Sequence, residues 1–206
     1  MENRSKWIFI GYAVLVLLIP AWIIRSSENI LSNGKEYKFR VQGRDPFDFF
    51  RGNYLTVRID TRGISTDKSD WISGEKVYLK IATDERGYAY FEEALENPPK
   101  KGDYMVSRVV RWWDTGAFWG GGSRERTTVD VEMPNNLNKY FINEEFAMDG
   151  EYVLQKFRRA SSVHVRVLNG SVRMEDLYIG PTPIMEYLED GGPIPEEEDE
   201  FEMFGF

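Results

Sequence analysis

An uncharged apolar run near the start of the chain limits what this protein can fold into more than any other feature. It covers eighteen residues, from Trp7 to Ile24, with the sequence WIFIGYAVLVLLIPAWII. A helix of that length rises about 27 Å, close to the thickness of a bilayer's hydrocarbon core. Trp7 and Trp22 lie near its ends, where indole rings favour the membrane interface, and Pro20 is tolerated in membrane helices. The run is long for a secretory signal and no Ala-x-Ala-like cleavage site follows it, so we expect a retained single-pass anchor over residues 7–24.

The charges beside this run predict its orientation. Arg4, Lys6 and the amino terminus outweigh Glu2 before the run, whereas Arg25 and Glu28 balance after it. Positive flanks tend to stay in the cytoplasm, so we expect the rest of the chain outside the cytoplasmic membrane. We therefore divide the chain into a cytoplasmic stub with the anchor (1–25), a polar connector (26–34), an extracytoplasmic domain (35–188) and a tail (189–206).

Composition removes several classes of function. Eight of the 34 acidic residues lie between Glu189 and Phe206 with no basic residue among them, which leaves 26 acidic against 26 basic residues elsewhere. A body so close to neutral has no basic face for nonspecific nucleic-acid binding. The chain has no cysteine, which excludes disulfides, thiolate metal sites and cysteine nucleophiles. Its one histidine, His164, shares a strand face with Ser162 and Arg166, so we expect it at the surface. Because a lone histidine without nearby cysteine makes a poor metal site, we expect no metal, and we expect no cofactor.

Alternating apolar residues predict a β-rich body between anchor and tail. The expected strands cover 35–42, 53–59, 75–83, 87–91, 106–113, 127–133, 152–157, 163–168 and 172–179. Asn169-Gly170 between the last two is a strong hairpin signal. Residues 137–148 have helical spacing, 181–188 predict one helical turn, and 61–74 are expected to form a loop. The predicted fold is mainly β, a barrel- or sandwich-like domain with a short helix after one transmembrane helix.

The stretch from 44 to 59, RDPFDFFRGNYLTVRI, begins as a turn and ends as a strand. Pro46 and Gly52-Asn53 favour turns, and Leu55, Val57 and Ile59 alternate toward one face. Guanidinium groups can clamp turn carboxylates with paired hydrogen bonds. The stretch is therefore either a turn pinned by ion pairs or an anion or peptide-end site, and its polar residues are Arg44, Asp45, Asp48, Arg51, Asn53, Tyr54 and Arg58.

This stretch resembles the signature of the GDYXXLXY protein family, membrane-anchored bacterial proteins without a firmly assigned activity. Asp45-Pro46, Asp48, Arg51, Gly52 and Tyr54 match the DP-x-D-x-x-RGDY core. Asn53, Val57 and Ile59 stand where the family has Asp, Leu and Tyr. The resemblance implies a polytopic membrane protein as partner, because such proteins are often encoded beside members of this family.

A second stretch, KGDYMVSR at 101–108, echoes RGNYLTVR at 51–58. Each reads as a basic residue, glycine, Asx and tyrosine, followed by an apolar residue and, after two variable positions, arginine. A turn of this kind suits the start of a crossing strand in a small barrel, so the two copies hint at a pseudo-repeat.

Two further aromatic segments are candidate contact surfaces. Trp112, Trp113, Phe118 and Trp119 lie beside three consecutive glycines. They form either a hairpin tip folded onto the core or a docking loop for a partner, a ligand or the membrane interface. The acidic tail, expected to be disordered, ends with Phe201, Phe204 and Phe206 and is either a bare solvated tail or a short docking motif.

Recognisable catalytic motifs are absent from the sequence, which has no G-x-S-x-G, P-loop, dinucleotide fingerprint, H-E-x-x-H or C-x-x-C. The sequence indicates no catalytic residue. We interpret the chain as a non-enzymatic accessory or scaffold component of a cell-envelope complex in the inner membrane. One alternative is an extracytoplasmic module that binds a peptide or envelope polymer through Arg44, Arg51 and Arg58 and the tryptophans. Another is a hydrolase of unfamiliar type, which would need a carboxylate or lysine of strongly shifted pKa beside a serine.

Overall fold

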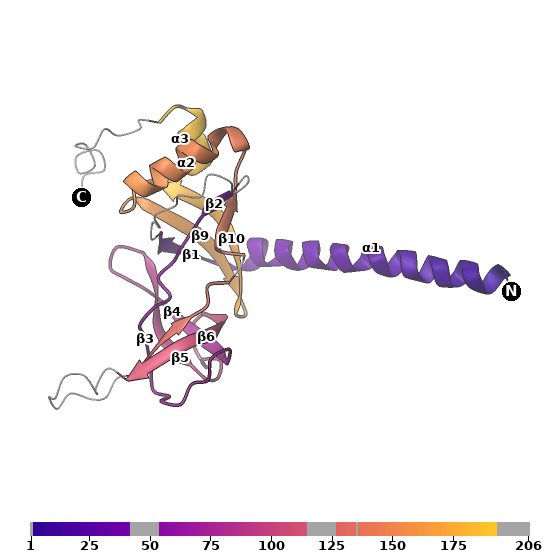
Figure 1. The fold of residues 1–206 in the computed structure, drawn as a ribbon, viewed down its shortest axis with the longest axis horizontal. Coiled ribbons are helices and arrows are strands. Elements are labelled where there is room, and N and C mark those ends of the chain that lie inside the picture. Colours follow the sequence, from indigo (N-terminus) through magenta and orange to yellow (C-terminus); the bar gives the residue numbers. More distant parts are fainter. Residues whose placement is uncertain (1, 42–53, 115–126, 135, 193–206) are drawn as a thin grey trace.

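The protein is a long helix joined to a β-rich domain (Figure 1). The structure, a computed structural model, describes residues 2–41, 54–114, 127–134 and 136–192. The first helix, α1, covers Glu2–Asn33 and projects away from the domain. From Lys6 onward it is long and apolar enough to span a membrane, and none of its most apolar stretch is buried against the rest of the protein.

Among the described residues, nine strands form one sheet in the order β11-β10-β9-β1-β5-β4-β6-β7-β3. Its strands are β1 (Lys35–Arg40), β3 (Ile64–Thr66), β4 (Lys76–Thr83), β5 (Ala89–Leu95), β6 (Tyr104–Asp114), β7 (Thr127–Val131), β9 (Ser161–Leu168), β10 (Ser171–Ile179) and β11 (Thr182–Pro183). β1 and β5 run parallel, and the other paired strands of the sheet are antiparallel. β2 (Tyr54–Thr56) and β8 (Lys139–Phe141) pair separately.

The sheet is curled, so that strands distant in its order meet. β3, at one edge, contacts β5 near the middle, which bends the β5-β4-β6-β7-β3 end toward a small barrel. Two helices, α2 (Glu144–Lys156) and α3 (Ile184–Glu189), lie at the other end, beside β9 and β10 (Figure 1). The predicted class, a single N-terminal helix followed by a mainly β domain with a short helix, is confirmed.

Buried side chains of the strands, of α2 and of α3 form one apolar core. Val163, Val165 and Val167 of β9 are buried, whereas His164 and Arg166 between them are partly exposed. Leu55, Val57 and Ile59 are likewise buried. Each strand thus gives one face to the core, as a period of two requires.

The β9–β10 hairpin forms as its sequence predicts, and its tip contacts β6, which lies toward the other end of the sheet. Asn169 and Gly170 both have positive φ, 50° and 81°, as a tight primed turn requires. The Val106 amide of β6 donates a 3.0 Å hydrogen bond to the Gly170 carbonyl. The hairpin tip therefore rests on the beginning of β6.

The helix near residue 140 was misplaced by sequence reasoning. Residues 139–141 are β8, and α2 begins after Asn143, whose side chain accepts a hydrogen bond from the Glu145 amide. α2 covers most of 152–157, which we predicted as a strand, because Val153, Leu154 and Phe157 bury one helical face. Two shorter differences are β3, inside a predicted loop, and β5, which continues to Leu95.

Candidate functional site

The joint between α1 and the sheet is closely packed, so α1 does not leave the domain through a flexible linker. α1 continues through residues 26–33, which we predicted as a connector, and ends where the Gly34 amide donates to the Ile30 carbonyl at 2.8 Å. Ile30 is 5% exposed, and α1 contacts both β9 and β10. A Cβ on Gly34 would lie 2.4 Å from the Ile30 carbonyl oxygen and 3.1 Å from the Val167 amide nitrogen.

Polar contacts complete this joint. The Arg173 Nε of β10 donates to the Ser27 hydroxyl of α1 at 3.1 Å, and Arg173 Nη1 donates to the Val172 carbonyl at 2.9 Å. The neighbouring Arg166 is held by carboxylates instead. It forms a two-pronged contact with Glu175 at 2.7 and 2.8 Å and lies 3.2 Å from Glu36.

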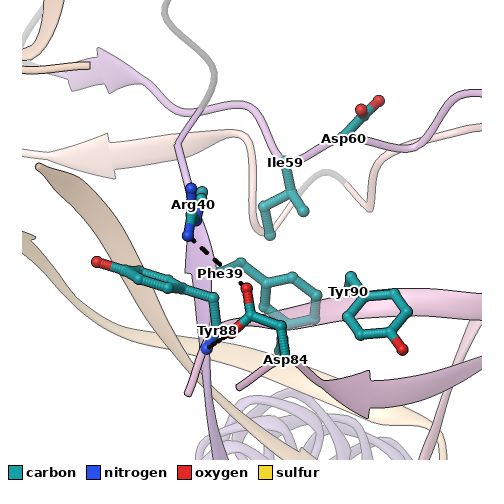
Figure 2. Close-up of a pocket in the computed structure, with 8 residues that line it drawn as sticks. Phe39, Arg40, Ile59, Asp60, Asp84, Tyr88 and Tyr90 are labelled. Carbon is teal, nitrogen blue, oxygen red and sulfur yellow. Dashed lines mark hydrogen bonds and ion pairs between the residues drawn. The ribbon is translucent and has the colours of Figure 1, made fainter. Parts of the chain in front are cut away.

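A second feature is a pocket of about 230 Å³ at the end of β1 (Figure 2). Its lining includes Phe39 and Arg40, which precede residues 42–53, and Ile59 and Asp60, which follow them. Residues 42–53 lie outside the described structure. Its apolar lining is Phe39, Ile59 and Ala89, and its polar and aromatic lining is Arg40, Asp60, Asp84, Tyr88 and Tyr90. The pocket therefore combines an apolar surface with charges of both signs.

The groups around this pocket are held by local contacts. Asp84 Oδ1 accepts hydrogen bonds from the Arg86 and Tyr88 amides at 2.9 and 2.8 Å, which fixes the β4–β5 turn. The Arg40 guanidinium lies 4.3 Å from the centre of the Tyr88 ring and 3.7 Å from Asp84 Oδ2. At that distance the ion pair is weak, so Arg40 keeps donors for another acceptor.

Most polar residues predicted in the 44–59 stretch lie outside the described residues, namely Arg44, Asp45, Asp48, Arg51, Gly52 and Asn53. Tyr54 begins β2, where its ring lies 4.5 Å from the Lys139 ammonium and 6.1 Å from the Phe141 ring. Arg58 is exposed. Of the three predicted arginines, the described residues include Arg58 alone.

The related stretch at 101–104 shows what one such turn does. Gly102 has a φ of +88°, and Tyr104 begins β6. The Asp103 carboxylate accepts a 2.7 Å hydrogen bond from the Tyr37 hydroxyl and lies 3.3 Å from Lys35 Nζ. Burial and the Asp103 carboxylate raise the pKa of Tyr37, which therefore stays protonated and donates. This clamp between β1 and β6 was not predicted.

Of the predicted contact residues, Trp112 and Trp113 can be placed. They lie near the end of β6 with 39% and 36% of their surface exposed. The Arg111 guanidinium lies 5.1 Å from the Trp113 ring centre and 2.9 Å from Asp130. In Figure 1, β6 ends on the side of the domain opposite to α1. Phe118, Trp119, Phe201, Phe204 and Phe206 lie outside the described residues.

His164 is more enclosed than predicted. Its Nδ1 lies 2.9 Å from Glu36 Oε1, and its ring stacks on Tyr178 with centroids 4.0 Å apart. Its Nε2 and the Ser162 hydroxyl are both buried, and neither has a hydrogen-bond partner among the described residues. Glu36, His164 and Ser162 therefore do not form a hydrogen-bonded triad.

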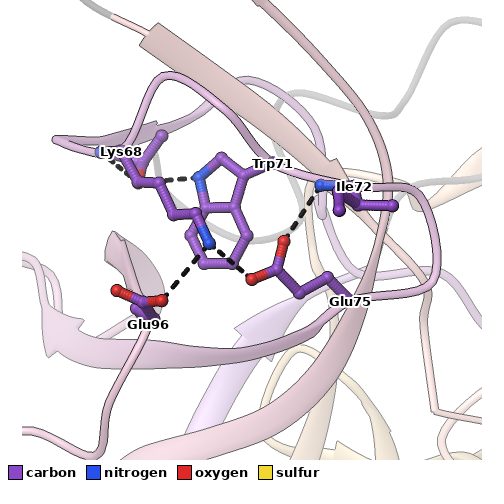
Figure 3. A network of polar contacts seen from close by, with 6 residues as sticks. Lys68, Trp71, Ile72, Glu75 and Glu96 are labelled. Carbon is purple, nitrogen blue, oxygen red and sulfur yellow. Dashed lines mark hydrogen bonds and ion pairs between the residues drawn. The ribbon is translucent and has the colours of Figure 1, made fainter.

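Another polar cluster, around Lys68, holds the segment that follows β3 in place (Figure 3). Lys68 Nζ lies 2.5 Å from Glu75, 3.4 Å from Glu96 and 4.6 Å from the Trp71 ring centre. The hydrogen bond from Lys68 lowers the pKa of Glu75, and Glu75 in turn raises the pKa of Lys68. A general-base lysine needs a lowered pKa, so we interpret this cluster as structural. No cluster of metal-ligating side chains occurs within the described ranges.

Comparison with known proteins identifies a family. The family model described as GDYXXLXY protein matches residues 16–177, which includes part of α1 and most of the β domain. No curated protein and no solved structure matches the chain.

Proposed function

Because the chain belongs to the GDYXXLXY protein family, and because one helix is long and apolar enough to span a membrane, we propose that it is a membrane-anchored accessory or scaffold component of a cell-envelope complex. The observation that carries this proposal is α1 itself. Its apolar side chains are exposed along its length, for example Trp7 at 73%, Leu17 at 72% and Trp22 at 72%. Exposed apolar surface of this extent marks a membrane or protein contact.

The closely packed joint supports a scaffold more than a simple tether. Ile30, Gly34 and the Ser27–Arg173 hydrogen bond hold α1 against β9 and β10. A domain held in this way keeps one orientation relative to the membrane. We place α1 in the inner membrane with the β domain outside the cytoplasm, following the charges that flank the apolar run.

The proposed partner is a polytopic membrane protein. Along α1, Gly11, Leu15, Leu18 and Trp22 line a shallow apolar hollow. Their spacing of four, three and four residues repeats along one side of a helix, and a glycine lets a neighbouring helix approach closely. β6, which carries Trp112 and Trp113 near its end, ends on the side of the domain opposite to α1 (Figure 1), so these tryptophans would meet a part of the complex outside the membrane.

A pull-down of the full-length chain in mild detergent tests the proposal. It compares wild type with Trp112→Ala/Trp113→Ala, with a truncation after Gly192, and with Phe141→Ala, whose exposed aromatic ring lies on β8. We expect one stoichiometric membrane partner that the tryptophan variant or the truncation loses and Phe141→Ala keeps. A chain without a partner in any sample would contradict the scaffold function.

The pocket in Figure 2 favours a second candidate, a module that binds a peptide or envelope polymer. Arg40 has free donors for a carboxylate, Asp60 and Asp84 carry negative charge, and Phe39 with Ile59 offers an apolar surface. Arg40→Gln would then weaken binding of an envelope-derived peptide to the full chain, whereas Arg158→Gln on the surface near α2 would not. Equal binding by both variants would contradict this candidate.

A further inference from the structure

The position of Ser27 in the sequence indicates how deep the joint between α1 and the β domain lies in a membrane. This step rests on the proposed function, in which α1 crosses a membrane. Ser27 is three residues beyond Ile24, the last residue of the uncharged run, and a helix places it about 4.5 Å beyond that run. The headgroup layer adds about 5–7 Å on each side of the hydrocarbon core. Ser27, and the Arg173 guanidinium bonded to it, therefore lie at the level of lipid phosphates.

Arg173 is positioned there without a counter-charge. Its two hydrogen bonds go to neutral acceptors, the Ser27 hydroxyl and the Val172 carbonyl, and the part of the chain that the structure describes places no carboxylate within 4.0 Å of it. A guanidinium has five N–H donors, so several remain for another acceptor. Arg166, on the adjacent strand, shows the opposite arrangement, with its donors taken by Glu175 and Glu36.

The other charges near Arg173 are accounted for by one another. Arg25 is exposed on the last turns of α1 and forms no ion pair with any described residue. Glu28 is the one acidic residue in the 25–33 part of the sequence, while Glu36 and Glu175 are occupied by Arg166. Arg25, Arg166 and Arg173 together balance Glu28, Glu36 and Glu175, so what would draw an anion is the unpaired Arg173 guanidinium and not an excess of positive charge. A half-buried cation of this kind is costly unless it finds an anionic partner.

We infer that Arg173, held by Ser27, binds the phosphate of a membrane phospholipid headgroup. Guanidinium and phosphate match in shape, because two parallel N–H donors meet two phosphate oxygens. The lipid would occupy the angle between α1 and β10. Such a contact would hold the β domain against the membrane in the orientation that the joint imposes.

The test uses the full chain in mild detergent with added phosphatidylglycerol, and native mass spectrometry to measure the fraction of protein carrying lipid. One basic residue near a membrane surface strengthens anionic-lipid binding about fivefold. We expect Arg173→Gln to weaken phosphatidylglycerol binding by about that factor and Arg173→Lys to weaken it less. Arg158→Gln, at an exposed arginine between α2 and β9, is the matched control and should bind as wild type does. Equal binding by Arg173→Gln and wild type would overturn the inference.

Two further measurements keep the inference testable if Arg173→Gln folds poorly. Phosphatidylglycerol should raise the Tm of the wild-type protein, whereas inorganic phosphate at the same concentration should not. An equal rise with inorganic phosphate would assign the site to free phosphate, and no rise with the lipid would refute binding. Carbonate washing of membranes separates this from the proposed function, since release of the wild-type chain would refute the anchor, whereas retention without lipid preference would refute the lipid site alone.

Discussion

Replacing Gly170 with alanine should destabilise the β domain by about 2–5 kcal/mol, by two separable effects. Gly170 has a φ of +81°, where an alanine costs about 1–2 kcal/mol. A Cβ there would lie 2.5 Å from Tyr104 Cε2 and 2.8 Å from Val106 Cγ2. The tip cannot withdraw freely, because the Gly170 carbonyl accepts the Val106 amide at 3.0 Å. Overpacking of this kind adds about 1–3 kcal/mol.

Gly87 provides a matched control for the backbone effect. Its φ is +82°, almost the same as that of Gly170, but an added Cβ would have no atom within 4 Å. Gly87→Ala should therefore cost only the conformational part, about 1–2 kcal/mol. The gain from a less flexible unfolded chain is common to both variants and cancels in their difference.

Urea unfolding of the full chain in mild detergent, followed by tryptophan fluorescence, measures both variants. The difference between Gly170→Ala and Gly87→Ala isolates the contact between the hairpin tip and β6, which we expect at about 1–3 kcal/mol. Equal losses in the two variants would show that the tip does not pack on β6 as described, and would refute this reasoning.

Three further predictions concern the joint, the Lys68 cluster and a buried hydroxyl. Gly34→Ala should lower stability by about 1–3 kcal/mol, because the added Cβ meets backbone atoms of α1 and β9, and Gly11→Ala in α1, which has no neighbour within 4 Å, should have little effect on the domain's urea midpoint. Glu75 has a lowered pKa in the folded state, so its contribution is present above about pH 4.3 and is lost as the pH falls below that value. Wild type should therefore be more stable than Glu75→Gln at pH 7, and a gap that does not shrink as the pH falls from 7 to 2.5 would contradict the ion pair. Ser162→Ala should leave stability unchanged or raise it by up to about 1 kcal/mol, since the Ser162 hydroxyl is buried without a partner, and a loss above that size in thermal unfolding would show a hidden hydrogen bond.

The elements that sequence reasoning placed correctly depend on local patterns. The apolar run, the alternating valines of β9 and the Asn169-Gly170 turn each carry their signal within a few residues. The errors arose where pairing is distant or spacing is ambiguous. β8 owes its conformation to β2, about eighty residues earlier in the chain, and no local pattern reveals such a partner. Residues 137–148 fit helical spacing, but the Asn143 cap decides where α2 begins.

The candidate sites were less predictable than the fold, because each joins distant segments. The pocket brings together the end of β1, residues 59–60 at the end of the 44–59 stretch and the β4–β5 hairpin, so Asp84 and Tyr88 carried no recognisable signal. The joint did leave a trace in the sequence. Ser27, Ile30 and Gly34 are spaced by three and four residues, the spacing of one helical face, although we interpreted the segment as a polar connector.

The most direct test of the account is a distance measurement across the joint between α1 and the β domain. The chain has no cysteine, so spin labels at Leu17→Cys on α1 and Gln155→Cys on α2 would be unique. Pulsed electron paramagnetic resonance on the protein in lipid nanodiscs should give one narrow distance distribution. A Gly-Ser insertion between Asn33 and Gly34 should broaden it. A distribution in the unmodified joint as broad as that of the insertion variant would contradict the claim that α1 holds the domain in one orientation.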